Sequence, residues 1–135
     1  MIVLLVEDNA ILAMAIQDEL ESAGHTVIGP AWSAAEARTL LLANAIEMAL
    51  VDIDLQDGRT GGDLAKEIKY SHACPVIFTT GQQHMAEAWQ DYAFGCLEKP
   101  FDPKVVVTII DVFEQGSAGK AADWPYQFIQ FAKMK

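Results

Sequence analysis

The chain has 135 residues, which is enough for one domain with a buried core and too few for a second catalytic domain. Hydrophobic residues make up 52% of it and charged residues 21%, a composition typical of folded proteins and unlike that of disordered chains. Nine Lys and Arg stand against nineteen Asp and Glu, and the net charge of −10 argues against direct DNA binding, because such a surface repels phosphate backbones.

The N-terminal apolar run and the two cysteines bear on the compartment of the protein. Residues 1–6 carry no basic segment and are followed at once by acids, so the run is too short for a signal peptide or a membrane span. We therefore expect a cytoplasmic protein without membrane insertion. Cys74 and Cys96 lie in apolar surroundings without C-x-x-C spacing, which predicts two buried, reduced thiols rather than a zinc site or a disulfide.

Short apolar runs alternate with helix-period segments from the first residue onward. This alternation predicts an α/β fold, a doubly wound five-stranded parallel sheet with helices on both faces. The first run is continuously aliphatic, as expected of a central strand that is buried on both sides. The expected strands cover residues 2–6, 25–29, 48–53, 76–80 and 96–98.

Three of the intervening helices have recognisable ends. Asn9 is the expected N-cap of the first helix, and Gly24 supplies its terminating position. Ser33-Ala34-Ala35-Glu36 is a capping box that opens the second helix. Asp102 caps the fifth helix, with Pro103 in its first position. The third and fourth helices are expected at about residues 62–70 and 83–92.

The end of the chain departs from this alternating pattern. Residues 1–115 form the predicted domain, 116–119 (Gly-Ser-Ala-Gly) a linker, and 120–135 an aromatic appendage. Helical spacing of its aromatic residues predicts a short helix that begins near Pro125. Because exposed aromatic surface is unfavourable in water, we expect this helix to pack on the domain itself or on a second subunit of a homodimer. The aromatic residues concerned are Trp124, Phe128 and Phe131.

Polar residues lie at or just after the carboxyl ends of four of the expected strands, where open parallel sheets bind ligands. They are Glu7 and Asp8, Asp52, Thr80, and Lys99. Three clustered carboxylates repel one another unless a hard dication binds among them, and Mg²⁺ suits such a site because it takes oxygen ligands. A carboxylate can also attack phosphorus to give an acyl phosphate, while a metal and a lysine neutralise the oxygens of the transferred group.

Ordinary structural roles are the alternative for several of these residues. Glu7 and Asp8 also suit the cap of the first helix, where they favour its dipole. Asp54 and Asp57 also suit a surface loop. Asp52 is harder to explain in this way, because an unpaired carboxylate at the end of a buried strand is costly.

Four segments resemble the motifs of response-regulator receiver domains of bacterial two-component systems, over about residues 1–115. Val6-Glu7-Asp8-Asn9 resembles the acidic pair, and Val51-Asp52-Ile53-Asp54-Leu55 the phosphoacceptor strand. Thr79-Thr80-Gly81 resembles the hydroxyl-bearing strand, and Glu98-Lys99-Pro100-Phe101 the lysine-proline turn. The resemblance implies a flavodoxin-like sheet with strand order 2-1-3-4-5.

The resemblance also implies a magnesium site. It makes Asp52 the phosphorylated residue and one of the ligands, Asp8 a direct ligand, and Glu7 a ligand that acts through water. Asp54 is expected to contribute its backbone carbonyl to the metal.

The remaining implied roles concern the phosphoryl group. Thr80 supplies the hydroxyl that moves onto it, Lys99 is its cationic partner, and the backbone amides of Asp54 and Gly81 contact its oxygens. The Lys-Pro peptide of the family is commonly cis, so Pro100 is expected to follow a cis bond.

The sequence departs from the common receiver pattern at two places near the switch. Cys96 stands where most receivers have an inward-flipping Tyr or Phe, and Gly81 stands where Ala is common. These features are similar to a receiver subclass whose fourth strand ends in a Phe-Ala-Thr-Gly-like motif, found beside histidine kinases of the HWE type. We expect such a switch to act through residues 81–95 instead of a ring at position 96.

The function implied is that of a single-domain response regulator without an enzymatic activity beyond its own phosphorylation and dephosphorylation. A sensor histidine kinase or phosphotransfer protein would donate the phosphoryl group to Asp52, and a downstream protein would read the change. Three alternatives remain open: a phosphate sink without output, a receiver-shaped binding module that no longer switches, and a phosphatase similar to the haloacid dehalogenases. The last rests on Asp52-x-Asp54, which resembles their D-x-D motif.

Overall fold

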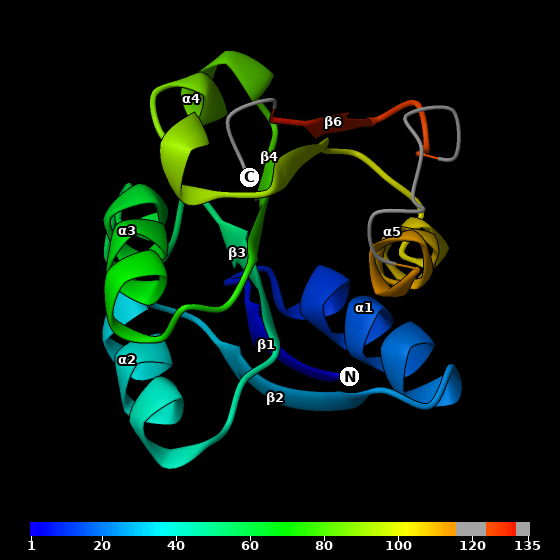
Figure 1. Ribbon diagram of the computed structural model, residues 1–135, viewed down its shortest axis with the longest axis horizontal. Coiled ribbons are helices and arrows are strands. Elements are labelled where there is room, and N and C mark those ends of the chain that lie inside the picture. The colour runs from blue at the N-terminus through cyan, green and yellow to red at the C-terminus, as the bar shows by residue number, and fades with distance from the viewer. Residues whose placement is uncertain (116–123, 132–135) are drawn as a thin grey trace.

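A computed structural model describes residues 1–115 and 124–131, in which one sheet forms the centre of the molecule (Figure 1). The strand order is β2-β1-β3-β4-β5-β6. The first five strands pair in parallel, as predicted, and β6 adds a sixth strand antiparallel to β5. The strands are β1 (Ile2–Val6), β2 (Thr26–Ala31), β3 (Met48–Asp52), β4 (Val76–Thr80), β5 (Gly95–Glu98) and β6 (Phe128–Gln130).

Helices cover both faces of the sheet. In Figure 1, α1 and α5 lie on one side, and α2 and α3 on the other. The helices are α1 (Ala10–Ser22), α2 (Ala34–Ala43), α3 (Gly61–Ser71), α4 (Gln83–Glu87), the 3-10 turn η1 (Gln90–Tyr92) and α5 (Lys104–Glu114). The expected caps form: Asn9 Oδ1 accepts a hydrogen bond from Leu12 N at 3.0 Å, and Ser33 Oγ accepts one from Glu36 N at 3.1 Å. Asp102 Oδ1 likewise accepts one from Lys104 N at 3.0 Å, but α5 begins at Lys104, so Pro103 precedes the helix instead of occupying its first position.

The fourth helix is shorter than the sequence predicts. It ends at Glu87, and a separate 3-10 turn follows instead of a continuous helix to Tyr92. Trp89, between the two elements, leaves helical geometry with φ −115° and ψ 15°. Its indole ring packs on Gly62 of α3, so a tertiary contact fixes this residue in a position that a continuous helix would not give it.

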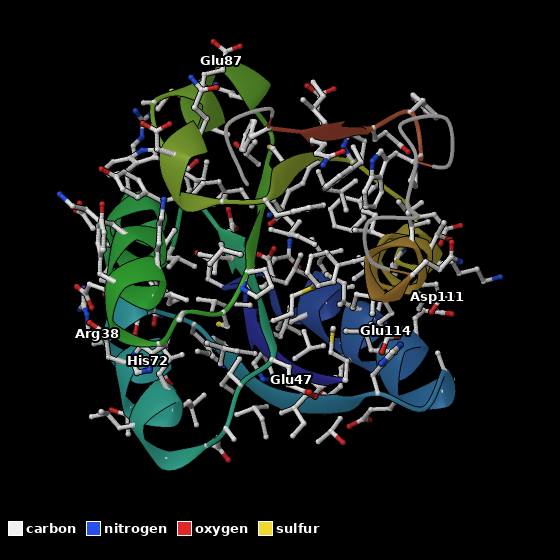
Figure 2. The ribbon with its side chains drawn as sticks, viewed as in Figure 1. Arg38, Glu47, His72, Glu87, Asp111 and Glu114 are labelled. Carbon is white, nitrogen blue, oxygen red and sulfur yellow. The ribbon has the colours of Figure 1, made fainter. Side chains whose placement is uncertain are left out.

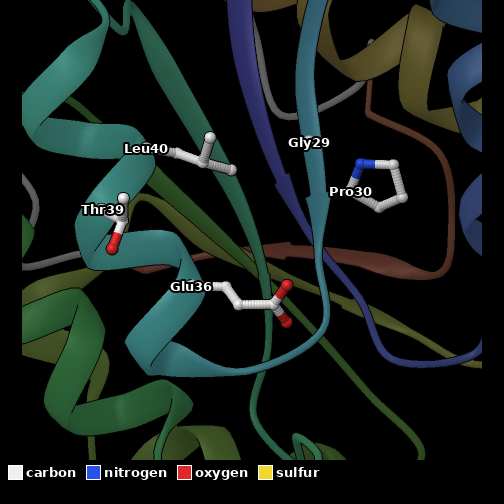
Figure 3. A pocket seen from close by; sticks show the side chains of 5 residues that line it. All are labelled: Gly29, Pro30, Glu36, Thr39 and Leu40. Carbon is white, nitrogen blue, oxygen red and sulfur yellow. The ribbon is translucent and has the colours of Figure 1, made fainter.

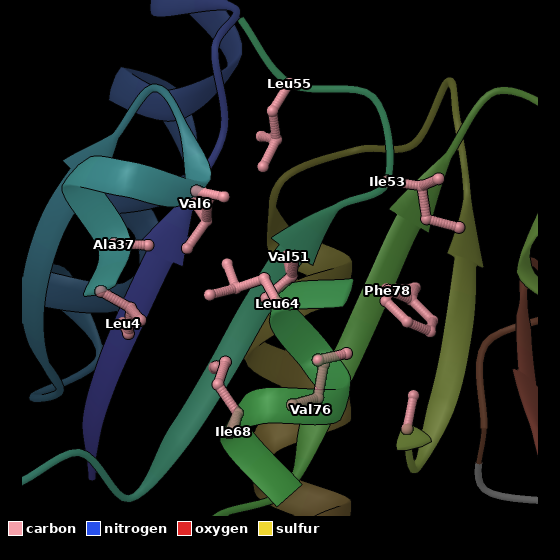
Figure 4. Close-up of a cluster of buried hydrophobic side chains, with 14 of the residues drawn as sticks. Leu4, Val6, Ala37, Val51, Ile53, Leu55, Leu64, Ile68, Val76 and Phe78 are labelled. Carbon is pink, nitrogen blue, oxygen red and sulfur yellow. The ribbon is translucent and has the colours of Figure 1, made fainter. Parts of the chain in front are cut away.

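The core consists of two apolar layers, one on each face of the sheet. Because side chains alternate along a strand, β1 sends Leu4 and Val6 to the layer under α2 and α3, and Val3 and Leu5 to the layer under α1 and α5. Figure 4 shows the first layer. All four side chains are at most 1% exposed, and burying each contributes about 1.5–3 kcal/mol. The central strands are thereby anchored from both sides.

The predicted C-terminal helix is wrong for the part of the appendage that the structure describes. Residues 128–130 form β6, which pairs with β5 in the register Leu97 opposite Phe128 and Cys96 opposite Ile129. The unpaired edge of β5 explains the outcome, since an edge strand offers backbone groups that a helix cannot satisfy. The segment packs on the domain itself, which was one of the two expected locations. Residues 116–123, with the predicted linker, and 132–135 lie outside the described residues.

Both cysteines are buried free thiols, as predicted. Burial raises the pKa of Cys74 to about 11 and that of Cys96 to about 12, and the charge of Glu98 adds to the second shift. Over the residues described here, no helix is both long and apolar enough to cross a bilayer.

Candidate functional site

The sheet register brings the polar residues of the sequence motifs to one edge. Val6 pairs with Val51, so Glu7 and Asp52 are the next residues along two adjacent parallel strands. Carboxylate oxygens of Glu7, Asp8 and Asp52 all lie within 4.8 Å of one another. Glu7 is only 2% exposed and Asp52 4%, whereas Asp8 is half-buried. The predicted cluster of three acids therefore exists, and two of its members are withdrawn from water.

Lys99 reaches this cluster from the end of β5. Its Nζ lies 2.9 Å from Glu7 Oε1 and 2.9 Å from Asp52 Oδ2. Its backbone N–H donates to Thr80 O at 2.8 Å, and the Lys99–Pro100 peptide is cis, as the sequence resemblance implies. The ammonium group is thus held between two buried carboxylates by a turn that is tied to β4.

One lysine does not balance three acids in this environment. Burial, followed by the charge of Glu7, raises the pKa of Asp52 to about 7, although Lys99 opposes the shift. Burial and Glu7 also raise the pKa of Asp8. Burial lowers the pKa of Lys99, but its close contacts with the carboxylates of Glu7 and Asp52 outweigh that effect and leave the pKa above its ordinary value. The single positive charge of Lys99 is therefore not enough to neutralise the three carboxylates.

The donor set fits a hard dication. Glu7 Oε1 is buried without a hydrogen bond of acceptable geometry, although the ammonium group lies close to it. Three carboxylates and one ammonium leave two negative charges, and the donors that converge here are oxygens. Mg²⁺ prefers this chemistry and needs only one or two carboxylates, since waters fill its other positions. Glu7, Asp8 and Asp52 are the side chains that can hold it.

The structure separates the two acids of the Asp52-x-Asp54 motif. The backbone N–H of Asp54 donates to Asp52 Oδ1 at 3.1 Å, so its main chain faces the site. Its side chain is 59% exposed and lies 3.3 Å from the Arg59 guanidinium. The second carboxylate of the motif therefore points into solvent and away from the first.

Thr80 lies at the end of β4 with its hydroxyl engaged by the following loop. Its Oγ1 accepts a hydrogen bond from Gln82 N at 3.1 Å and lies 3.2 Å from Gln82 O. A Cβ at Gly81, between the two, would meet no atom within 4 Å. The hydroxyl is thus hydrogen-bonded to the backbone of the loop that follows β4, next to open space at Gly81.

Gly61 and Gly62 form the buried start of α3, which begins one residue before the expected position. A Cβ at Gly61 would clash with the carbonyl oxygen of Asp52, and a Cβ at Gly62 would clash with the Trp89 ring. Adjacent glycines at the start of a helix were the available indication of close packing. Asp57, expected to be a loop acid, accepts backbone N–H bonds from Ala34 and Ala35 at the start of α2.

A second group of possible metal donors and a pocket lack the buried, lysine-paired carboxylates of the site around Asp52. His25, Asp111 and Glu114 also bring possible metal donors together, but Asp111 and Glu114 are exposed on α5 (Figure 2). The N-terminal ammonium group lies 3.1 Å from His25 Nδ1 and disfavours a second cation there. A pocket of about 430 Å³ lies between β2 and α2 (Figure 3), away from the acidic site. Its lining residues are Gly29, Pro30, Glu36, Thr39 and Leu40.

A family model described as "Response regulator receiver domain" matches residues 3–111. The chain belongs to this family. Its receiver domain is thus a component of two-component signalling, and the match includes every predicted site residue. β6 lies outside the matched residues.

Similar proteins include a curated regulator and two solved structures that share the fold of this receiver domain. Phyllosphere-induced regulator PhyR of Methylorubrum extorquens is 32% identical over 121 residues, which are 86% of this chain and 45% of PhyR. The crystal structure of PhyR from Brucella abortus matches with a TM-score of 0.73 and 32% identity, over 87% of this chain and 50% of that one. A CheY-like receiver domain protein from Methanospirillum hungatei JF-1 matches with a TM-score of 0.72 and 25% identity, over 87% and 98% of the two chains. This chain spans about half the length of PhyR.

Proposed function

We propose that this receiver domain accepts a phosphoryl group on Asp52 in a magnesium-dependent reaction and signals through the resulting conformational change. The observation that carries the proposal is the environment of Asp52. It is a buried carboxylate at the end of β3, in contact with Lys99 and within 4.8 Å of Glu7 and Asp8. Such an arrangement suits a nucleophile that must lie beside both a dication and a fixed ammonium group.

In the proposed reaction, an Asp52 carboxylate oxygen attacks the phosphorus of a phosphohistidine. An O–P bond forms, the P–N bond breaks, and the histidine nitrogen keeps the electron pair. Asp8 and Asp52 would hold Mg²⁺ directly, Glu7 through water, and Asp54 through its backbone carbonyl. The metal would supply positive charge to the phosphoryl oxygens and keep Asp52 ionised. Lys99 neutralises a further oxygen through its Nζ.

Thr80 and two backbone amides would stabilise the product. The Thr80 hydroxyl would give up its hydrogen bond to Gln82 O and donate to a phosphoryl oxygen instead. The new hydrogen bond would be charge-assisted and therefore stronger. The N–H of Asp54 already faces Asp52, and that of Gly81 follows the threonine. The loop after β4 would therefore rearrange on phosphorylation, with Cys96 too small to act as an aromatic lever.

The donor would be a sensor histidine kinase or a phosphotransfer protein, and a downstream protein would read the phosphorylated state. The similarity to PhyR supports a place in the receiver subclass that accompanies HWE-type kinases. A phosphate sink would use the same chemistry without an output partner. The haloacid dehalogenase alternative is disfavoured, because the second acid of its motif, Asp54, pairs with Arg59 at the surface.

Labelling with acetyl phosphate tests the proposal. We expect one phosphate per chain by intact mass with Mg²⁺ present, and none with excess chelator. Asp52→Asn should abolish labelling, whereas Asp54→Asn, the matched control two residues away, should label as wild type does. Steady hydrolysis of small phosphate esters, or labelling that is independent of Mg²⁺, would overturn the proposal.

A further inference from the structure

The β5 edge of the sheet is occupied by the chain's own C-terminal segment. β6 pairs with β5, Glu98 N donates to Gln127 O at 3.1 Å, and Phe131 N donates to Phe94 O at 3.0 Å. This segment, residues 124–131, lies outside the receiver match. It therefore covers backbone groups that an edge strand would otherwise offer to another chain.

An aromatic cluster reinforces this docking. The Phe128 ring is 5% exposed and sits against Gly95, where a Cβ would clash with it. Ring centroids of Phe94 lie 5.0 Å from Phe113, 5.5 Å from Trp124 and 6.1 Å from Phe128. Phe94 and Phe113 belong to the domain, while Trp124 and Phe128 belong to the segment. The domain thus presents a strand edge and an apolar site matched to an extended aromatic segment.

The docked segment holds both neighbours of Lys99. Gln127 O accepts the N–H of Glu98, and Gln127 Nε2 donates to Pro100 O at 3.4 Å. The N–H of Lys99 itself donates to Thr80 O on the other side. The turn that positions the ammonium group is consequently tied to β4 and to the C-terminal segment at once.

We propose that residues 124–131 form a latch that closes the β5 edge while Asp52 is unmodified and opens when it is phosphorylated. This inference rests on the proposed function of Asp52. In the unmodified state, Lys99 Nζ lies 2.9 Å from Asp52 Oδ2, which leaves no room for a phosphoryl group between them. Insertion of that group pushes the lysine and its turn back, and the bonds to Gln127 weaken. The exposed edge then accepts an extended apolar segment of a protein partner.

Amide exchange measured by NMR tests the latch on the intact chain. Beryllofluoride with Mg²⁺ serves as the aspartyl-phosphate mimic. We expect exchange of the Glu98 and Phe131 amides to accelerate at least tenfold on its addition, with no acceleration in Asp52→Asn. If resonances around Asp52 shift but these two amides exchange at the same rate, the latch is wrong and the proposed function stands. If no resonance around Asp52 shifts, the proposed function itself fails.

Coupling is reciprocal, so opening the latch must favour phosphorylation. Phe128→Ala removes the buried ring, while Tyr126→Ala, in the same segment and 91% exposed, is the matched control. We expect Phe128→Ala to bind beryllofluoride in the presence of Mg²⁺ with a dissociation constant about tenfold lower than that of Tyr126→Ala. An equal or higher dissociation constant for the folded Phe128→Ala protein would refute the latch, and the exchange measurement on wild type decides the matter if this variant does not fold.

Discussion

Asp52 has a pKa of about 7 because the fold buries its carboxylate beside Glu7. The ordinary pKa of an aspartate in an unfolded chain is about 3.9. Between these values the folded protein binds the proton more tightly than the unfolded chain does, so ionisation of Asp52 costs stability as the pH rises. We predict that, without Mg²⁺, the free energy of unfolding falls between about pH 4 and pH 7.

Asp52→Asn should remove this dependence and raise the free energy of unfolding at pH 8 without metal. The gain should be on the order of 2 kcal/mol, since one pKa unit corresponds to about 1.4 kcal/mol and the surroundings relax around the charge. Urea unfolding at several pH values measures it. Asp54→Asn is the control, because that carboxylate faces solvent. A wild-type protein more stable at pH 7 than at pH 5 without metal, and a destabilised Asp52→Asn, would contradict this account.

The two thiols provide a second prediction at the residue scale. With pKa values of about 11 and 12 and little exposure, Cys74 and Cys96 should resist alkylation by iodoacetamide at pH 8 in the folded protein. Both should react fully in denaturant. Mass spectrometry of the alkylated protein gives the number of labels. Rapid labelling of Cys96 in the folded protein would show that its thiol is not buried in β5 as described.

At the residue scale, a site residue could be predicted where the sequence pattern shows that it lies at the end of a strand. Asp52 follows an apolar run and Lys99 follows the short strand that ends at Glu98, and the rule that ligands gather at the carboxyl ends of parallel strands brings them together. The pairing of Lys99 with Glu7 as well as Asp52 was not predictable, because it depends on the path of one flexible side chain. The adjacent Gly61 and Gly62 indicate close packing, but the sequence does not show which atoms press against them.

At the scale of elements, the first turn of α3 packs between the backbone at Asp52 and the ring of Trp89. Gly62→Ala places a methyl group against the indole ring, and we predict a loss of about 1–3 kcal/mol in stability despite the better helix propensity of Ala. Gly81→Ala, where the added atom meets nothing within 4 Å, is the control. Thermal unfolding followed by Trp fluorescence compares them. Equal stability of the two variants would contradict the described packing.

Most strands and the capped helices followed from local signals, whereas the early end of α4 and the formation of β6 did not. The aliphatic runs gave β1 and β4 their observed bounds, and the polar caps gave α1 and α2 their starts. The spacing of Trp124, Phe128 and Phe131 suggested a helix, yet β6 formed because the β5 edge and Gly95 are distant in sequence and supply its partners. Sequence periodicity does not show which distant segments of a chain pair with each other.

For the molecule as a whole, metal binding and folding should be coupled. Mg²⁺ binds the assembled acids and not the unfolded chain, so it stabilises the folded state by mass action, by about 2.7 kcal/mol at one hundred times its dissociation constant. We predict a higher melting temperature with Mg²⁺ for wild type and a much smaller increase for Asp8→Asn. Asp111→Asn, on the exposed face of α5, is the control. An equal increase in all three proteins would mean that Mg²⁺ acts on the net charge of −10 and not at the site.

The most direct test of the central claim is to locate the phosphoryl group. After labelling with acetyl phosphate and Mg²⁺, borohydride reduces an aspartyl phosphate to homoserine, and peptide sequencing by mass spectrometry finds the converted residue. We predict homoserine at position 52 alone, with Asp54 and Asp57 unchanged in the same peptide. Homoserine at position 54 or 57, or a phosphate retained on a hydroxyl side chain, would contradict the assignment of Asp52 as the phosphoacceptor.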